Sequence, residues 1–86
     1  MRYTLTYFDK VGSRAFTDNF NDKKEAIEMF GKLVSAYEHD GTDNTGLELW
    51  DTNEDKLLAE WNAAEGTYIW DKEIEAYMQD KQKEGK

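Results

Sequence analysis

The sequence contains no cysteine and no proline, and its only histidine is His39. The absence of cysteine excludes disulfides, thiolate metal ligands and cysteine nucleophiles, and it favours a reducing compartment. A single imidazole cannot form a catalytic triad or a histidine-rich metal site. We therefore interpret His39 as a residue at the C-terminal end of a helix, where positive charge is favourable.

Long apolar runs and glycine-rich phosphate loops are also missing. Residues 1–6 form no apolar leader core, and no run approaches the ~20 apolar residues of a membrane-spanning helix. Neither G-x-G-x-x-G nor G-x-x-x-x-G-K-[ST] occurs. The nineteen acidic residues offer many carboxylate pairs, but no spacing singles out one pair for acid–base chemistry. We expect a cytoplasmic protein that is not an enzyme, with no catalytic residue, metal or cofactor.

The chain is, in contrast, rich in aromatic side chains. Three tryptophans, five tyrosines and four phenylalanines among 86 residues can bury enough apolar area for a small core. The length predicts one domain over residues 1–86, with a frayed tail at 80–86.

Two periodicities predict the secondary structure. Alternating apolar and polar residues favour strands at 3–8, 14–20, 46–51 and 56–62. A central helix is expected between a capping Asp22 and a terminating Gly41. Its apolar stripe comprises Ala26, Ile27, Phe30, Leu33, Val34 and Tyr37. Gly31 lies within this helix and would permit close packing on the sheet.

A second helix is predicted from Asp71 onward, with an apolar stripe of Trp70, Ile74, Tyr77 and Met78. Residues 63–67 are interpreted as a linker or a turn, and residues 68–70 as a short extended piece. The predicted fold is therefore α+β. It has a four-stranded antiparallel sheet in ββαββα order, a central amphipathic helix and a C-terminal helix.

Strand alternation leaves a second apolar face whose cover is undecided. With Leu57, Ala59 and Trp61 facing inward, Trp50 and Leu58 fall on the opposite face. Either the C-terminal helix covers this face, or the face is open to a partner or a second copy.

The excess of negative over positive charge lies entirely in the second half of the chain. Residues 1–39 carry six basic and six acidic side chains, whereas residues 40–86 carry five basic and thirteen acidic ones. The net charge of −8 disfavours direct binding to nucleic acids and to anionic membranes. The acidic residues could serve only to keep the protein soluble, or they could form a surface that binds a basic partner.

The segment Asp51, Asn53, Asp55 begins like a calcium-binding EF-hand loop, but the pattern then fails. Lys56 stands at the sixth position, where glycine is needed, and Asn62 at the twelfth, where a bidentate glutamate is needed. The segment is better interpreted as a hairpin turn.

Two functional hypotheses follow. The first is a non-enzymatic binding or regulatory protein that acts on a basic protein partner, as an inhibitor of phage or mobile-element type or as a nucleic-acid mimic. Its anionic surface would comprise Glu48, Asp51, Glu54, Asp55 and Glu60. The alternative is a structural module in which Trp50 and Leu58 pair two copies as a homodimer.

Overall fold

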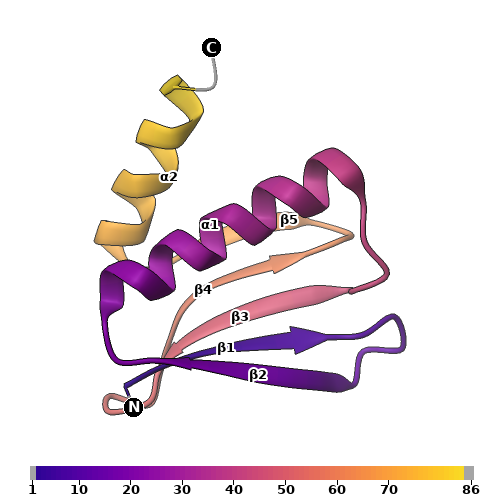
Figure 1. Ribbon diagram of the computed structural model, residues 1–86, viewed down its shortest axis with the longest axis horizontal. Coiled ribbons are helices and arrows are strands. Elements are labelled where there is room, and N and C mark those ends of the chain that lie inside the picture. The colour runs from indigo at the N-terminus through magenta and orange to yellow at the C-terminus, as the bar shows by residue number, and fades with distance from the viewer. Residues whose placement is uncertain (1, 85–86) are drawn as a thin grey trace.

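In a computed structural model, the chain forms a five-stranded antiparallel sheet and two helices (Figure 1). The structure describes residues 2–84, with the backbone alone at residues 15, 16 and 81–84. The strands are β1 (Tyr3–Phe8), β2 (Arg14–Phe20), β3 (Gly46–Asp51), β4 (Lys56–Asn62) and β5 (Gly66–Ile69). The helices are α1 (Lys23–Asp40) and α2 (Lys72–Glu84).

The strands lie in the order β2-β1-β3-β4-β5. The two expected hairpins, β1–β2 and β3–β4, join through antiparallel pairing of β1 with β3, in which Leu5 lies opposite Leu49. The α+β class and the antiparallel sheet are therefore confirmed. The prediction of four strands in ββαββα order was wrong, because a fifth strand precedes α2.

The additional strand, β5, arises from a turn that the composition conceals. Residues 63–65 include no typical turn former, but the Asn62 side-chain oxygen accepts hydrogen bonds from the backbone N–H groups of Ala64 and Glu65, at 3.1 and 2.6 Å. Gly66 then adopts a φ of 90°, which residues with a side chain rarely take. The chain reverses there and pairs with β4, so of the two alternatives for this segment, linker or turn, the structure shows a hairpin turn.

Helix α1 begins and ends as expected. The Asp22 carboxylate accepts a hydrogen bond from the Lys24 N–H at 2.9 Å, which satisfies one of the free amides at the helix start. The Gly41 N–H donates to the Tyr37 carbonyl at 2.9 Å, and Gly41 has a φ of 81°. Both predicted caps are confirmed.

The core lies between α1 and one face of the sheet. Its fully buried large side chains are Leu5, Phe30, Leu47, Leu49 and Ile74. Asp18 interrupts the apolar alternation of β2 on this side, where it accepts a hydrogen bond from the Tyr7 hydroxyl at 2.9 Å. Burial and this hydrogen bond raise the pKa of Tyr7 above its ordinary value.

Helix α2 lies against α1, on the same side of the sheet as the core. Ile74 of α2 is buried in the same cluster as Phe30. The Lys23 ammonium, at the start of α1, forms ion pairs with Asp71 at 3.0 Å and Glu73 at 3.1 Å. Asp71 also accepts a hydrogen bond from the Ile74 N–H. Among the helices of the described residues, neither is long and apolar enough to cross a bilayer.

Gly31 provides the close contact between the helices, not a contact with the sheet as expected. A Cβ atom at this position would lie 2.8 Å from the Tyr77 ring and 3.3 Å from the Met78 sulfur. The predicted tail at 80–86 overlaps α2, which continues to Glu84, while residues 85 and 86 lie outside the described residues.

Replacement of Gly31 by valine should therefore loosen α2. The larger side chain needs space that Tyr77 and Met78 occupy, and such overpacking costs about 1–3 kcal/mol. We expect faster hydrogen exchange at the amides of α2, with exchange in β1 and β3 changed much less. Equal acceleration in the central strands and α2 would contradict this packing account.

Candidate binding surface

The surface opposite the helices carries the polar half of each strand. Because side chains alternate along a strand, the neighbours of the buried Leu5, Leu47 and Leu49 point to the other side. We call this surface the open face, and it comprises Thr4, Thr6, Thr17, Glu48, Trp50, Leu57, Glu60 and Tyr68. Of the two alternatives left open for Trp50, the structure shows the uncovered one, since α2 packs on α1 through Ile74 and beside Gly31.

Leu58 does not belong to the open face, and its expected place beside Trp50 was wrong. The register of β3 and β4 shifts between Leu49 and Trp50, so Leu49 lies opposite Ala59 while Trp50 lies opposite Leu57. This bulge inserts one residue and turns Leu58 into the core, where it is 4% exposed. Leu57 is therefore the aliphatic neighbour of Trp50.

Two carboxylates face each other at the middle of the open face. Glu48 on β3 and Glu60 on β4 are direct cross-strand partners, and both are half-buried. The Trp50 indole N–H donates to Glu48 at 2.9 Å, which fixes the orientation of that carboxylate. Within the described part of the chain, no cationic side chain pairs with either acid. Like charges placed opposite one another destabilise a sheet, so this pair costs the fold stability.

Aromatic rings flank these acids on the β5 side. Tyr68 lies opposite Glu60, and its ring stacks on that of Trp70 with centroids 6.2 Å apart and planes inclined by 20°. Tyr68 is 43% exposed and Trp70 is 53% exposed. The Tyr68 hydroxyl donates to Glu65 at 2.9 Å, and this bond with the nearby negative charge raises the pKa of Tyr68. Trp70 thus lies before α2 and outside the core stripe in which the sequence placed it.

A shallow depression of about 310 Å³ adjoins Trp50 on the β1–β2 side of the open face. Thr4, Thr6 and Thr17 contribute to its lining. The depression therefore presents hydroxyl groups beside an indole ring, a surface that can make both hydrogen bonds and apolar contacts.

Asp51 is an acid that the structure removes from the expected anionic surface. It is 5% exposed, and its carboxylate forms an ion pair with the Arg2 guanidinium at 3.1 Å. It also accepts hydrogen bonds from the backbone N–H groups of Asn53 and Glu54. These contacts lower the pKa of Asp51, with the bond from Arg2 contributing most. The predicted hairpin turn is confirmed, and Asp51 holds it to the N-terminal strand.

Replacement of Asp51 by asparagine should destabilise the protein by about 1–2 kcal/mol at neutral pH, because Arg2 loses its partner and is itself partly solvated. The pKa of Asp51 is lower in the folded chain than its ordinary value of 3.8. Its stabilising contribution is therefore present above about pH 4 and lost as the pH falls through the lowered pKa. Urea unfolding across this range should show a smaller acid-side loss in the variant.

The matched control for this change is Asp55→Asn. Asp55 is exposed in the same turn and has a φ of 51°, a conformation that asparagine accepts. We expect its stability to stay within about 0.5 kcal/mol of the parent. Equal losses from the two substitutions would contradict the role assigned to Asp51.

The remaining expected acids lie at the end of the sheet. Glu54 and Asp55 are exposed in the β3–β4 turn, and Asp55 borders the depression beside Trp50. The structure therefore places Glu48 opposite Glu60 and leaves Glu54 and Asp55 exposed at the rim of the open face. Asp51 is buried in an ion pair with Arg2 and does not belong to the anionic surface. Leu57, Tyr68 and Trp70 were missed, although the two-residue spacing of Tyr68 and Trp70 is typical of one strand face.

No protein-family model, curated protein or solved structure matches this chain. Among the described residues, no group of three histidine, cysteine or acidic side chains is placed to hold a metal ion. The open face is therefore the feature of the described residues that bears on function.

Proposed function

We propose that this protein is a non-enzymatic binding protein that recognises a basic protein partner through the open face. The observation that carries the proposal is the cross-strand pair of Glu48 and Glu60 beside the exposed Tyr68–Trp70 stack. The acids alone fit a solubilising surface, and the rings alone fit any apolar contact. Their juxtaposition favours a cationic ligand.

Electrostatics supports a basic partner. Two carboxylates on adjacent strands repel each other until a cation approaches both, so binding would remove an unfavourable interaction and create favourable ones. The net charge of −8 would also accelerate encounter with a cationic surface, an effect that salt suppresses.

The rings favour arginine over lysine in that partner. A guanidinium group can bond a carboxylate in a bidentate manner and stack on an aromatic face, whereas an ammonium group is a compact and strongly hydrated charge. Trp50 lies two residues from Glu48 on β3, and Trp70 stacks on Tyr68, the cross-strand partner of Glu60. Tryptophan is enriched among residues that dominate binding energy.

Self-association is the competing use of this face. A two-fold pairing of open faces would bring together two surfaces on each of which the acids Glu48, Glu60 and Asp55 outnumber Arg14, the cation that lines the depression beside Trp50. We therefore assign the face to a different protein. The proposal also includes a cytoplasmic location and a role of phage or mobile-element inhibitor type, in which the carboxylates stand in for phosphates.

A fluorescence titration tests the proposal. An arginine–glycine repeat peptide should change the tryptophan emission of the protein, a glutamate–glycine repeat should not, and added salt should weaken the effect. Trp50→Ala should reduce the affinity for the arginine peptide. No response to the arginine peptide at low salt would overturn the proposal, as would light scattering that shows a dimer disrupted by Trp50→Asp.

A further inference from the structure

Strand β2 is the long free edge of the sheet. It occupies one end of the strand order and has seven residues, whereas β5 at the other end has four. Edge strands present unpaired backbone groups, and proteins protect them with charged side chains, proline, bulges or short length. In β2, Arg14 and a bulge lie at the start of the strand and Asp18 bonds Tyr7 on the core side, while Thr17–Phe20 contains neither lysine nor proline.

The register identifies the backbone groups at this edge. The Phe20 carbonyl accepts a hydrogen bond from the Arg2 N–H, so Phe20 directs its backbone toward β1. In an antiparallel pair, successive residues direct their backbone groups to opposite sides. Thr17 and Asn19 therefore direct their N–H and C=O groups away from β1, toward the free edge.

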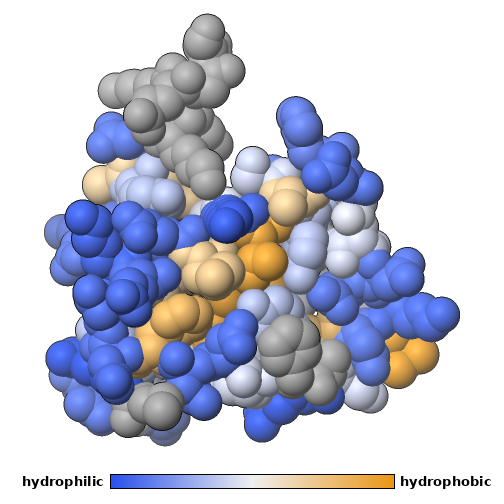
Figure 2. Space-filling model, viewed as in Figure 1, coloured by the Kyte–Doolittle hydropathy of each residue, from blue (hydrophilic) through white to orange (hydrophobic). Residues whose placement is uncertain are grey.

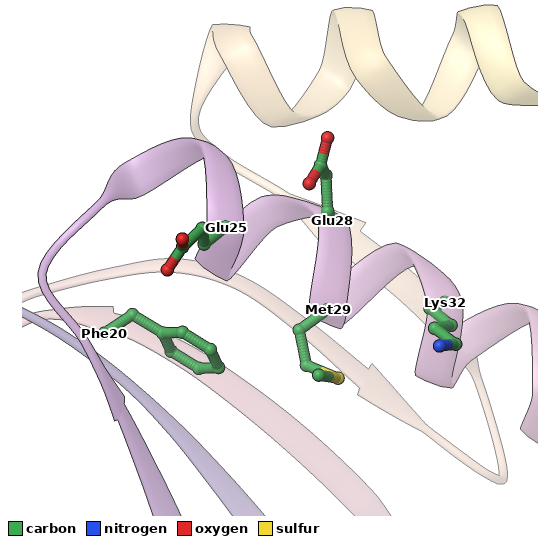
Figure 3. Close-up of a pocket in the computed structure, with 5 residues that line it drawn as sticks. All are labelled: Phe20, Glu25, Glu28, Met29 and Lys32. Atoms are coloured by element: carbon green, nitrogen blue, oxygen red, sulfur yellow. The ribbon is translucent and has the colours of Figure 1, made fainter.

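A groove of about 340 Å³ lies between this strand and α1 (Figure 3). Phe20 and Met29 form its apolar wall, and Glu25 and Lys32 lie along its helical side. The carboxylate of Glu28 points away from Phe20 and Met29. Figure 2 shows an apolar band beside α1 that hydrophilic residues border.

From this juxtaposition, we propose that an extended segment of another protein adds to β2 as a sixth strand and inserts a large apolar side chain between Phe20 and Met29. Strand addition draws affinity from backbone hydrogen bonds and specificity from alternate side-chain pockets. The groove lies on the other side of the sheet from the open face, and the inference shares with that face only Thr17, whose side chain lines the depression beside Trp50.

Charge identifies this segment as basic and as foreign to the chain. Glu25 lines the groove near Phe20, Asp18 and Asp22 are each two residues from Phe20 in sequence, and Lys32 lies two turns further along α1. A basic residue beside the inserted apolar one would therefore meet carboxylates. A second copy carries a net charge of −8 over the whole chain, although residues 1–39 sum to zero, and this long-range repulsion disfavours pairing of β2 with β2.

A phage-displayed library of random heptapeptides, selected on the whole protein, tests the inference. Selected peptides should combine basic residues with one large apolar residue. Thr17→Pro removes an edge N–H, and edge strands tolerate proline, so it should weaken binding about tenfold or more. Thr17→Val keeps the N–H and should bind like the parent. Met29→Glu should weaken binding through the groove alone.

Three results would overturn the inference: no enrichment of peptides, undiminished binding to both Thr17→Pro and Met29→Glu, or a parent dimer that Thr17→Pro dissociates. Circular dichroism establishes that each variant is folded, and Met29→Glu serves as the test if Thr17→Pro is not. Trp50→Ala should leave these peptides bound. Loss of peptide binding in Trp50→Ala would show that the selected peptides bind the open face. The sixth-strand proposal would then be wrong, whereas the proposed function would not be affected.

Discussion

The double substitution Glu48→Gln and Glu60→Gln is expected to abolish most binding to a basic partner while making the protein more stable. Glutamine keeps the size and the hydrogen-bonding oxygen of glutamate, so Trp50 can still donate to residue 48. Removing two facing negative charges should raise the free energy of unfolding by about 0.5–1 kcal/mol at low salt. Affinity for the arginine–glycine peptide should fall about tenfold or more.

The charge-matched control is Glu28→Gln with Glu38→Gln. Both residues are exposed on α1, so the net charge changes equally while the open face remains intact. Only the long-range electrostatic attraction should weaken, so the affinity for the arginine–glycine peptide should fall by a few-fold at low salt. Urea unfolding and peptide titration of both double variants measure the contrast. Equal loss of affinity in the two would show that net charge, and not the open face, attracts the peptide.

Replacement of Phe30 by alanine is expected to have the largest effect on stability. The ring is fully buried, at the centre of the cluster between α1 and the sheet. Truncation of a buried phenylalanine costs about 3–5 kcal/mol, a large part of the 5–15 kcal/mol that stabilises a typical domain. Thermal unfolding followed by circular dichroism should show a large decrease in Tm.

Trp50→Ala is the matched comparison on the other side of the sheet. This larger ring is only half-buried and lies on the open face, so its loss should cost no more than about 2 kcal/mol. It should nevertheless reduce affinity for the arginine peptide. If Trp50→Ala were as destabilising as Phe30→Ala, the open face would have to be part of a core.

Local patterns were sufficient to predict most of the fold. The strands at residues 3–8, 14–20, 46–51 and 56–62 match the observed bounds. Their alternation follows directly from one buried face, and the caps of α1 are encoded by Asp22 and Gly41. The pairing of β1 with β3 joins residues far apart in sequence, so no local pattern identifies it.

The candidate site was predicted only in part, because one inserted residue decides which leucine is exposed. A bulge depends on how two strands fit together, so the sequence of β4 alone assigned Leu58 to the wrong side. The withdrawal of Asp51 into an ion pair likewise depends on Arg2, which is distant in sequence. Glu48 and Glu60 were predicted to lie on the anionic surface, but only the register of β3 and β4 shows that they are direct cross-strand partners.

Chemical-shift mapping of the amide and indole N–H groups during titration with the arginine–glycine peptide tests the central claim most directly. The account predicts that the largest shifts occur at Glu48, Glu60 and the Trp50 indole, whose donor bonds Glu48. Small shifts are expected on the exposed side of α1. Shifts spread evenly over the acidic residues of α1, α2 and the loops, with none concentrated on the open face, would contradict the account.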